Sequence, residues 1–177
     1  MPHPVDQSAF RGALGRFASG VTVVTTRVDG ADHALTASAF TSVALDPPLV
    51  LVCIDHKSRF HAAVSASRTW AVSILAEANQ ASATWFATRG RPLEGQLDRV
   101  EHRPAKVIDT VLIDAALAWL ECETWQTYDG VDHTIMVGKV VHAEVGEGDD
   151  PLLYYRSHYA SLVRSGESEK SADSDTP

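Results

Sequence analysis

The residues best suited to chemistry in this sequence are Ser58 and Arg59, which stand just after the apolar run 49–54. The pattern of residues 58–67 predicts a helix, so Ser58 lies at its start. A helix start presents free backbone N–H groups and the positive end of the helix dipole, and a guanidinium adds two parallel donors for phosphate oxygens. The pair therefore indicates a phosphate-binding position. The alternative is that Ser58 only caps the helix and that Arg59 is a solvated charge.

Two other stretches offer groups for a ligand. Small residues fill the run from Thr36 to Ala39, and their slim side chains and hydroxyls let a flat ligand approach the backbone. His133 follows the Asp- and Gly-rich turn 128–132, so its imidazole is expected to project into a cleft. The alternative for His133 is a turn histidine that caps the end of a strand.

Hydrolytic and metal-dependent chemistry find no support in the sequence. A Gly-x-Ser-x-Gly motif is absent, and no Ser or Cys stands in a motif with a recognisable base. The eight His and two Cys residues are scattered, and His56 with His61 lacks a second pair at ligand spacing, so we expect no metal site. What remains is redox chemistry on a bound cofactor, for which the protein supplies position and electrostatics.

The elements that must position these residues are mostly strands. A helix is expected between Asp6 and Gly20, and two more at 58–67 and 79–88; strands are expected over 21–28, 35–40, 49–54, 70–75, 107–113, 117–122 and 134–145, with a loop or mobile flap at 89–104 and an aromatic segment at 151–162. The strands come in pairs without a regular βαβ alternation, which favours a mainly β, antiparallel barrel with a few helices over a doubly wound sheet. No Gly-x-Gly-x-x-Gly motif follows a strand, so any nicotinamide would bind without a Rossmann unit.

Length and composition limit the classes of partner. The 177 residues suit one domain, which we place at residues 1–163, and the polar segment 164–177 is expected to be a disordered tail. A formal charge of −8 argues against binding to nucleic acid or to acidic membranes. Cys53 and Cys122 lie in apolar strand patterns, as expected of reduced thiols in a cytoplasmic protein. No N-terminal leader pattern and no membrane-spanning run is seen.

Several motifs together resemble the flavin reductase family, the small reductase components of two-component flavin-dependent monooxygenases. They are TASAFTSVALDPPLVLVCI followed by SRFH, GVTVVTT near the start, GVDHTI late in the chain and PLLYYR near the end, in the family's order from about Phe10 to Leu162. The resemblance implies an antiparallel split β-barrel that dimerises, with flavin sites near the subunit interface.

The resemblance also assigns flavin contacts to residues in the first half of the chain. The turn at Thr36, Ala37 and Ser38 is expected to contact the flavin ring and ribityl chain, whereas Ala39 stands where many members have a second Ser. Together with the phosphate position, the expected flavin contacts are Thr36, Ala37, Ser38, Ala39, Ser42, Val43, Cys53, Ile54, Asp55, Ser58 and Arg59. Taken alone, Cys53 is better explained as a buried small hydrophobe than as a redox thiol.

Three later residues are assigned to the pyridine nucleotide. In the family, the histidine matching His133 lies against the nicotinamide, which makes it the candidate catalytic residue. Arg156 and Tyr159 match the last family block, and are expected to clamp a pyridine-nucleotide phosphate or to stack on a ring. The alternative for this block is an aromatic core segment with one surface arginine.

The activity that the resemblance implies is NAD(P)H:flavin oxidoreduction. The cofactors are FMN or FAD and NADH or NADPH, and reduced flavin would pass to a separate oxygenase component. The protein is expected to be a homodimer that binds neither nucleic acid nor membrane. One rival hypothesis is a non-catalytic flavin-binding redox or sensor protein, and another is a flavin enzyme that oxidises a small substrate by itself.

Overall fold

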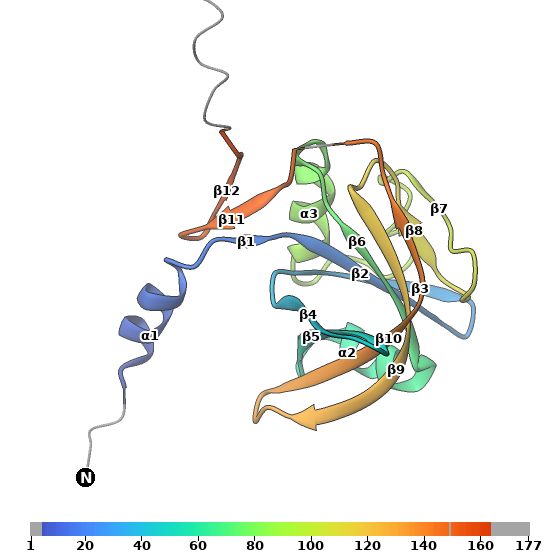
Figure 1. Cartoon of the computed structure of the whole chain (residues 1–177), viewed down its shortest axis with the longest axis horizontal. Helices are drawn as coiled ribbons and strands as arrows, with labels where there is room; N and C mark the ends of the chain where they lie inside the picture. Colours follow the sequence, from blue (N-terminus) through green and yellow to red (C-terminus); the bar gives the residue numbers. More distant parts are fainter. Residues whose placement is uncertain (1–4, 149, 164–177) are drawn as a thin grey trace, which may run out of the picture.

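The chain folds into a mainly β structure, described here from a computed structural model for residues 5–148 and 150–163 (Figure 1). The expected tail at 164–177 lies outside these described residues. Most elements predicted from the sequence are found within a few residues of their expected bounds. None of the helices in the described part is both long and apolar enough to cross a membrane.

The main sheet is antiparallel, with strand order β3-β2-β6-β9-β10-β5-β4. Its strands are β2 (Thr22–Val28), β3 (Ala31–Ala37), β4 (Phe40–Leu45), β5 (Pro48–Asp55), β6 (Thr69–Ile74), β9 (Ala118–Asp129) and β10 (His133–Val145). The turn between β2 and β3 lies at Asp29 and Gly30, which have φ angles of 51° and 76°. Two successive positive φ angles match the right-handed twist of a two-residue hairpin, so the antiparallel, mainly β prediction is confirmed from its first hairpin onward.

Both faces of the main sheet are buried at β2, because successive residues of this strand enter different core clusters. On β2, Val23 packs with Phe86 and Leu112 in one cluster. The next residue, Val24, packs in the other cluster, which contains Trp70. This burial on both sides explains why β2, with the sequence TVVTTRV, shows no strict alternation of apolar and polar residues.

The two long strands β9 and β10 form an arched hairpin that reaches from the body of the protein (Figure 1). Register shifts between Val137 and Gly138 and between Val140 and His142 bend the hairpin. On its other side β10 pairs with β5, and this register places His133 opposite Asp55. The start of β10 and the end of β5 therefore meet at one place.

Two helices flank the main sheet: α2 begins near that place, and α3 ends near it. The helix α2 (Arg59–Ser67) begins with Ser58 as its N-cap, as predicted, and packs mainly on β2. The helix α3 (Gln80–Ala87) follows the single turn η1 (Glu77–Asn79) and packs mainly on β3. Ala83 and Phe86 of α3 are buried, so this side of the helix faces the core.

An arm stands apart from the main body (Figure 1). It contains α1 (Gln7–Leu14) and a small sheet in the order β1-β11-β12, built from β1 (Ser19–Gly20), β11 (Leu153–Tyr155) and β12 (His158–Ala160). Asp6 caps α1 as predicted, but the helix ends at Leu14 with Gly15 as its cap, well before Gly20. The apolar side chains of this region are uncovered, with Phe10, Leu14 and Phe17 exposed by 55%, 57% and 79%.

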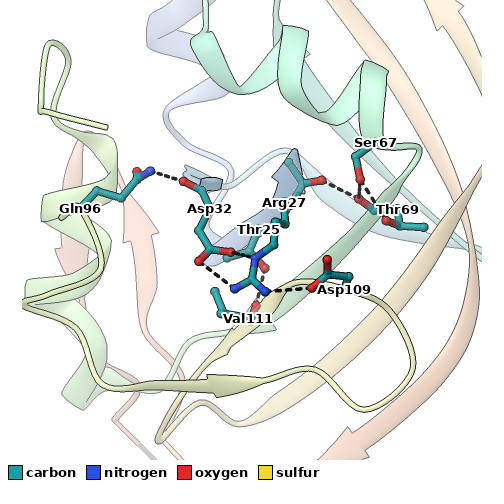
Figure 2. Close-up of polar contacts among 9 residues, drawn as sticks. Thr25, Arg27, Asp32, Ser67, Thr69, Gln96, Asp109 and Val111 are labelled. Atoms are coloured by element: carbon teal, nitrogen blue, oxygen red, sulfur yellow. Dashed lines mark hydrogen bonds and ion pairs between the residues drawn. The ribbon is translucent and has the colours of Figure 1, made fainter. Parts of the chain in front are cut away.

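The segment after α3 is fixed to the sheet, although its regular structure is limited to β7 (His102–Pro104) and its partner β8 (Val111–Ile113). The Gln96 amide donates to the carbonyl oxygen of Asp32, and the Asp32 carboxylate pairs with Arg27 (Figure 2). Arg27 also pairs with Asp109 at 2.8 Å. The segment expected as a loop or mobile flap at 89–104 is thus a packed loop tied to β2 and β3.

Candidate functional site

A cavity of about 630 Å³ lies where β3, β5, α2, α3 and β10 come together. Nine of the residues proposed from the sequence line it: Thr36, Ala37, Ser38, Ala39, Cys53, Asp55, Ser58, Arg59 and His133. They come from segments up to about a hundred positions apart in the chain, and the pairing of β5 with β10 brings the last of them next to the others. The volume falls within the usual range for small-molecule and cofactor sites.

The small-residue run forms one wall of the cavity. It begins at the end of β3 and continues into the turn before β4, and the N–H of Cys53 donates to the carbonyl oxygen of Ala39 at 3.1 Å. The Thr36 hydroxyl donates to the carbonyl oxygen of Ala83 at 2.7 Å, which ties this wall to α3. Its proton is therefore engaged, and its lone pairs remain as acceptors for a ligand.

Cys53 lines the cavity as a thiol and not as a thiolate. Burial raises its pKa, so the neutral form dominates at neutral pH. A protonated, partly buried thiol is a poor nucleophile and acts as an apolar wall. This agrees with the sequence-based interpretation of Cys53 as a small hydrophobe.

The start of α2 forms the second wall. The Ser58 oxygen accepts from the N–H of Phe60 at 3.2 Å, so Ser58 does cap the helix, while its hydroxyl proton stays available to a ligand. The Asp55 carboxylate accepts from the N–H of Lys57 at 2.8 Å and orders the turn before the helix. Arg59 is exposed at the cavity, and one of its guanidinium nitrogens donates to the carbonyl oxygen of Arg91 at 2.8 Å.

The loop after α3 forms the third wall and adds positive charge. Arg89, Arg91 and Lys57 line the cavity beside Arg59, whereas Asp55 contributes the carboxylate. Arg89 approaches Asp55 at 3.8 Å, but it is almost fully exposed, so this ion pair is weak. The positive field also acts on His33, whose pKa is lowered by burial and then by the charge of Arg59. The cavity is therefore basic in a chain of net charge −8.

His133 lies at the cavity with its side chain 43% exposed. Its Nδ1 atom is 2.7 Å from Oδ1 of Asp132. The hydrogen bond from His133 is the main reason why the pKa of Asp132 lies below its usual value. An ionised Asp132 favours a proton on Nδ1, so Nε2 of the neutral ring is left as an acceptor. A ring held in this way can orient a ligand.

Five proposed site residues lie outside this cavity. Ile54 has a relative exposure of 0% and faces the core, since it has the opposite parity to Cys53 and Asp55 on β5. Ser42 and Val43 are exposed on β4. Arg156 and Tyr159 belong to the arm: the N–H of Arg156 donates to the carbonyl oxygen of Gly15, and Tyr159 lies on a second, more open hollow beside α3.

The sequence-based proposal missed the basic loop of the cavity. Arg89, Arg91 and Gln96 follow α3, in the segment that the sequence predicts to be a loop or mobile flap with no ligand contacts assigned to it. A detectable signal was present, because Arg89-Gly90-Arg91 places two cations around a glycine in an acidic chain. What the pattern did not reveal is that this loop folds back onto β3.

The cavity residues fit a flat anionic ligand. Slim side chains along the cavity give access for a ring, and the cations that also line it suit phosphate groups. Neither Arg59 nor Arg91 pairs with a carboxylate within residues 5–148 and 150–163, so part of the positive charge is uncompensated there. The same described residues contain no group of three or more His, Cys, Asp or Glu side chains placed to hold a metal ion. A flavin nucleotide, which combines a planar ring with phosphate, matches this donor set.

Known proteins resemble the chain over most of its length. It is 38% identical over 162 residues to the reductase component of 4-nitrophenol 4-monooxygenase/4-nitrocatechol 2-monooxygenase from Rhodococcus opacus, covering 90% of this chain and 83% of the relative. The flavin reductase component of a bacterial two-component tryptophan halogenase has a TM-score of 0.84 at 40% identity, covering 89% of this chain and 98% of that one.

A third relative was solved in complex with NAD and FAD fragments, and is an NADH:FAD oxidoreductase from Streptomyces globisporus C-1027. Its TM-score is 0.86 at 32% identity, covering 94% of this chain and 98% of that one. These likenesses confirm the expected flavin-reductase-like split β-barrel. A family model described as "Flavin reductase like domain" matches residues 14–163. The chain therefore belongs to the flavin reductase like family.

Proposed function

We propose that the protein is an NAD(P)H:flavin oxidoreductase that supplies reduced FMN or FAD to a separate oxygenase component. The observation that carries the proposal is that one cavity brings together the small-residue turn, the basic start of α2 and His133. The relatives described as reductase components and as an NADH:FAD oxidoreductase support it, and they favour NADH and FAD among the alternatives.

Each wall of the cavity has a role in this proposal. The turn from Thr36 to Ala39 lets the flavin ring lie close to the backbone. Ser58 and Arg59 hold the phosphate through the helix start and the guanidinium. The chemistry that the bound cofactors supply is hydride transfer from nicotinamide to flavin. His133, oriented by Asp132, lines the remaining side and positions the nicotinamide.

A homodimer is part of the proposal. The uncovered apolar side chains of α1 and the separate arm leave a surface that a second copy can bury. Arg156 and Tyr159 lie away from the cavity of their own protomer, so they act on a cofactor only where the arm packs on a partner. Free Cys53 and Cys122 fit a reducing compartment, and we place the protein in the cytoplasm.

The test is steady-state oxidation of NADH with free flavin as the variable substrate. The proposal expects a rate that saturates with flavin concentration, and reduced flavin that appears in solution under anaerobic conditions. A non-catalytic flavin sensor would bind flavin but show no NADH turnover. A self-sufficient oxidase would keep its flavin through many turnovers and oxidise an organic compound without a partner protein. Either of these last results rejects the proposal.

A further inference from the structure

The side chain of Arg91 is used entirely within the protein. Its Nη1 atom donates to the carbonyl oxygens of Phe86 at 2.8 Å and Thr88 at 3.1 Å, and its Nη2 atom donates to the carbonyl oxygen of Ala34. Phe86 belongs to the last turn of α3, and Ala34 lies in the middle of β3. One guanidinium thus fastens the loop to the end of a helix and to the edge strand of the main sheet.

The backbone of Arg91 has a different function from its side chain. Its carbonyl oxygen accepts the hydrogen bond from Nη2 of Arg59 at 2.8 Å. Arg59 is otherwise a long, exposed side chain with many rotamers, and this bond selects one direction for its guanidinium. The bond joins residues 32 positions apart, so it exists only while the loop stays in place.

A buried positive charge at Arg91 is unfavourable, which argues that the residue does more than hold the loop in place. Burial and then the neighbouring charge of Arg59 lower the pKa of Arg91. Its Nε atom is buried without a hydrogen-bond partner among the described residues. Two cations held together in this way are costly unless they bring a compensating gain. An anion bound at Arg59 provides that gain, because it neutralises the pair.

We propose that Arg91 is a positioning residue for the flavin phosphate: it locks the loop to β3 and α3 so that its carbonyl oxygen aims the Arg59 guanidinium into the cavity. The inference rests on the proposed function, in which Arg59 holds the phosphate. The side chain of Arg91 is committed to the protein, since both of its Nη atoms donate to carbonyl oxygens and its Nε is buried, so its effect on the phosphate is exerted through Arg59. Lysine cannot replace it, because a single ammonium group lacks the planar fork that reaches several carbonyls at once.

The experiment measures equilibrium binding of FMN and of riboflavin, which lacks the phosphate, by quenching of flavin fluorescence. The variants are Arg59→Ala, Arg91→Lys and the double variant, with Arg99→Lys as a matched control. Arg99 lies in the same loop but is exposed and stacks on Trp85, outside the cavity. Arg91→Lys keeps the positive charge but removes the planar guanidinium that reaches several carbonyl oxygens. It therefore separates the effect of positioning from the effect of net charge.

We expect Arg91→Lys to weaken the binding of FMN, which carries the phosphate, more than the binding of riboflavin. Arg91→Lys raises the Kd for FMN about five- to tenfold and changes the Kd for riboflavin less than about twofold. In the Arg59→Ala background the same substitution adds less than about twofold, because the residue that it positions is gone. Arg99→Lys leaves both dissociation constants unchanged. If Arg91→Lys fails to fold, Arg91→Gln takes its place in the same cycle; because it also removes a charge, only the part of its effect that disappears in the Arg59→Ala background is assigned to positioning.

The outcomes separate this inference from the proposed function. An unchanged Kd for FMN in Arg59→Ala means that the phosphate does not bind at Arg59, and both proposals for this position fall. Strong loss in Arg59→Ala, with Arg91→Lys weakening FMN and riboflavin equally, leaves the phosphate position intact and overturns the role of Arg91. Additive effects in the double variant overturn it as well.

Discussion

Replacing Glu121 by glutamine tests how the structure holds a buried charge. Glu121 lies on β9 with a relative exposure of 0%. Its Oε1 atom accepts from the N–H of Lys106 at 2.8 Å, and its Oε2 atom accepts from the N–H groups of Val107 and Ile108 at 2.7 and 3.0 Å. One carboxylate thus organises the chain between β7 and β8. The glutamine amide has nearly the same shape, but one of its ends is a donor.

The expected loss in the free energy of unfolding follows from these three hydrogen bonds. The better orientation of the amide keeps the oxygen against Val107 and Ile108 and turns its NH₂ group toward the N–H of Lys106. One charge-assisted bond, worth about 1.5–3 kcal/mol, is lost, and a buried donor is left unpaired. The two remaining bonds fall to the neutral range of about 0.5–1.5 kcal/mol each. We therefore expect Glu121→Gln to lower the free energy of unfolding by about 3–5 kcal/mol at pH 7.

The carboxylate of Glu121 should also make the free energy of unfolding depend on pH. Burial raises the pKa of Glu121, but the three backbone N–H bonds, with a smaller contribution from His142, outweigh burial and hold the pKa below its usual value. A lowered pKa in the folded state gives stability that is complete above the unfolded-state pKa of about 4.3 and is lost as the pH falls toward the folded-state pKa. The difference between wild type and Glu121→Gln should therefore narrow below about pH 4.

Urea denaturation followed by tryptophan fluorescence, at a series of pH values, measures both effects. Glu123→Gln is the matched control: it lies two residues further on β9, is exposed, and should change stability by less than about 0.5 kcal/mol. A loss below about 1 kcal/mol in Glu121→Gln, or a loss that does not depend on pH, would contradict the reasoning.

Three further predictions concern the site and its support. His133→Ala should raise the KM for NADH and leave the flavin Kd nearly unchanged in steady-state and fluorescence assays; equal loss of both means that the turn has collapsed. Gly138→Ala should cost about 1–3 kcal/mol in denaturant unfolding, because the new Cβ overlaps the ring of Trp70, and a neutral result would show that the ring can shift. Flavin should protect Cys53 from alkylation at pH 8, read by mass spectrometry, whereas Cys122, whose pKa burial raises to about 12, should stay unmodified with or without flavin; modification of Cys122 in the folded protein would contradict its burial.

Local features of the sequence were enough to determine many elements and part of the site. The Asp29-Gly30 pair predicts its hairpin because these residue types tolerate the positive φ angles that the turn requires. Ser58 predicts the start of α2 because its oxygen can accept a backbone N–H near the helix start. The motifs around Thr36, Arg59 and His133 resemble those of the family. The structure brings the residues named from these motifs into one cavity. Each of these signals depends on a few neighbouring residues.

The alternation of side chains along β5 decides which of its proposed site residues border the cavity. Cys53 and Asp55 line the cavity, while Ile54 between them faces the core, since successive side chains of a strand point to opposite faces. The motif alone named all three. The alternation was available in the sequence, but the face that borders a ligand depends on which other elements pack against β5.

The tertiary structure alone decided the basic wall of the cavity. Arg91 reaches Ala34 and Arg59 across 57 and 32 positions, and neither separation corresponds to a helical or strand period. The arm likewise places Arg156 beside Gly15 and away from the cavity of its own protomer. The contact with Ala34 arises because a carbonyl group on the edge strand β3 takes a donor from elsewhere in the chain. The donor can come from any loop that passes β3 in the folded protein. The sequence around Arg91 therefore does not reveal its partner.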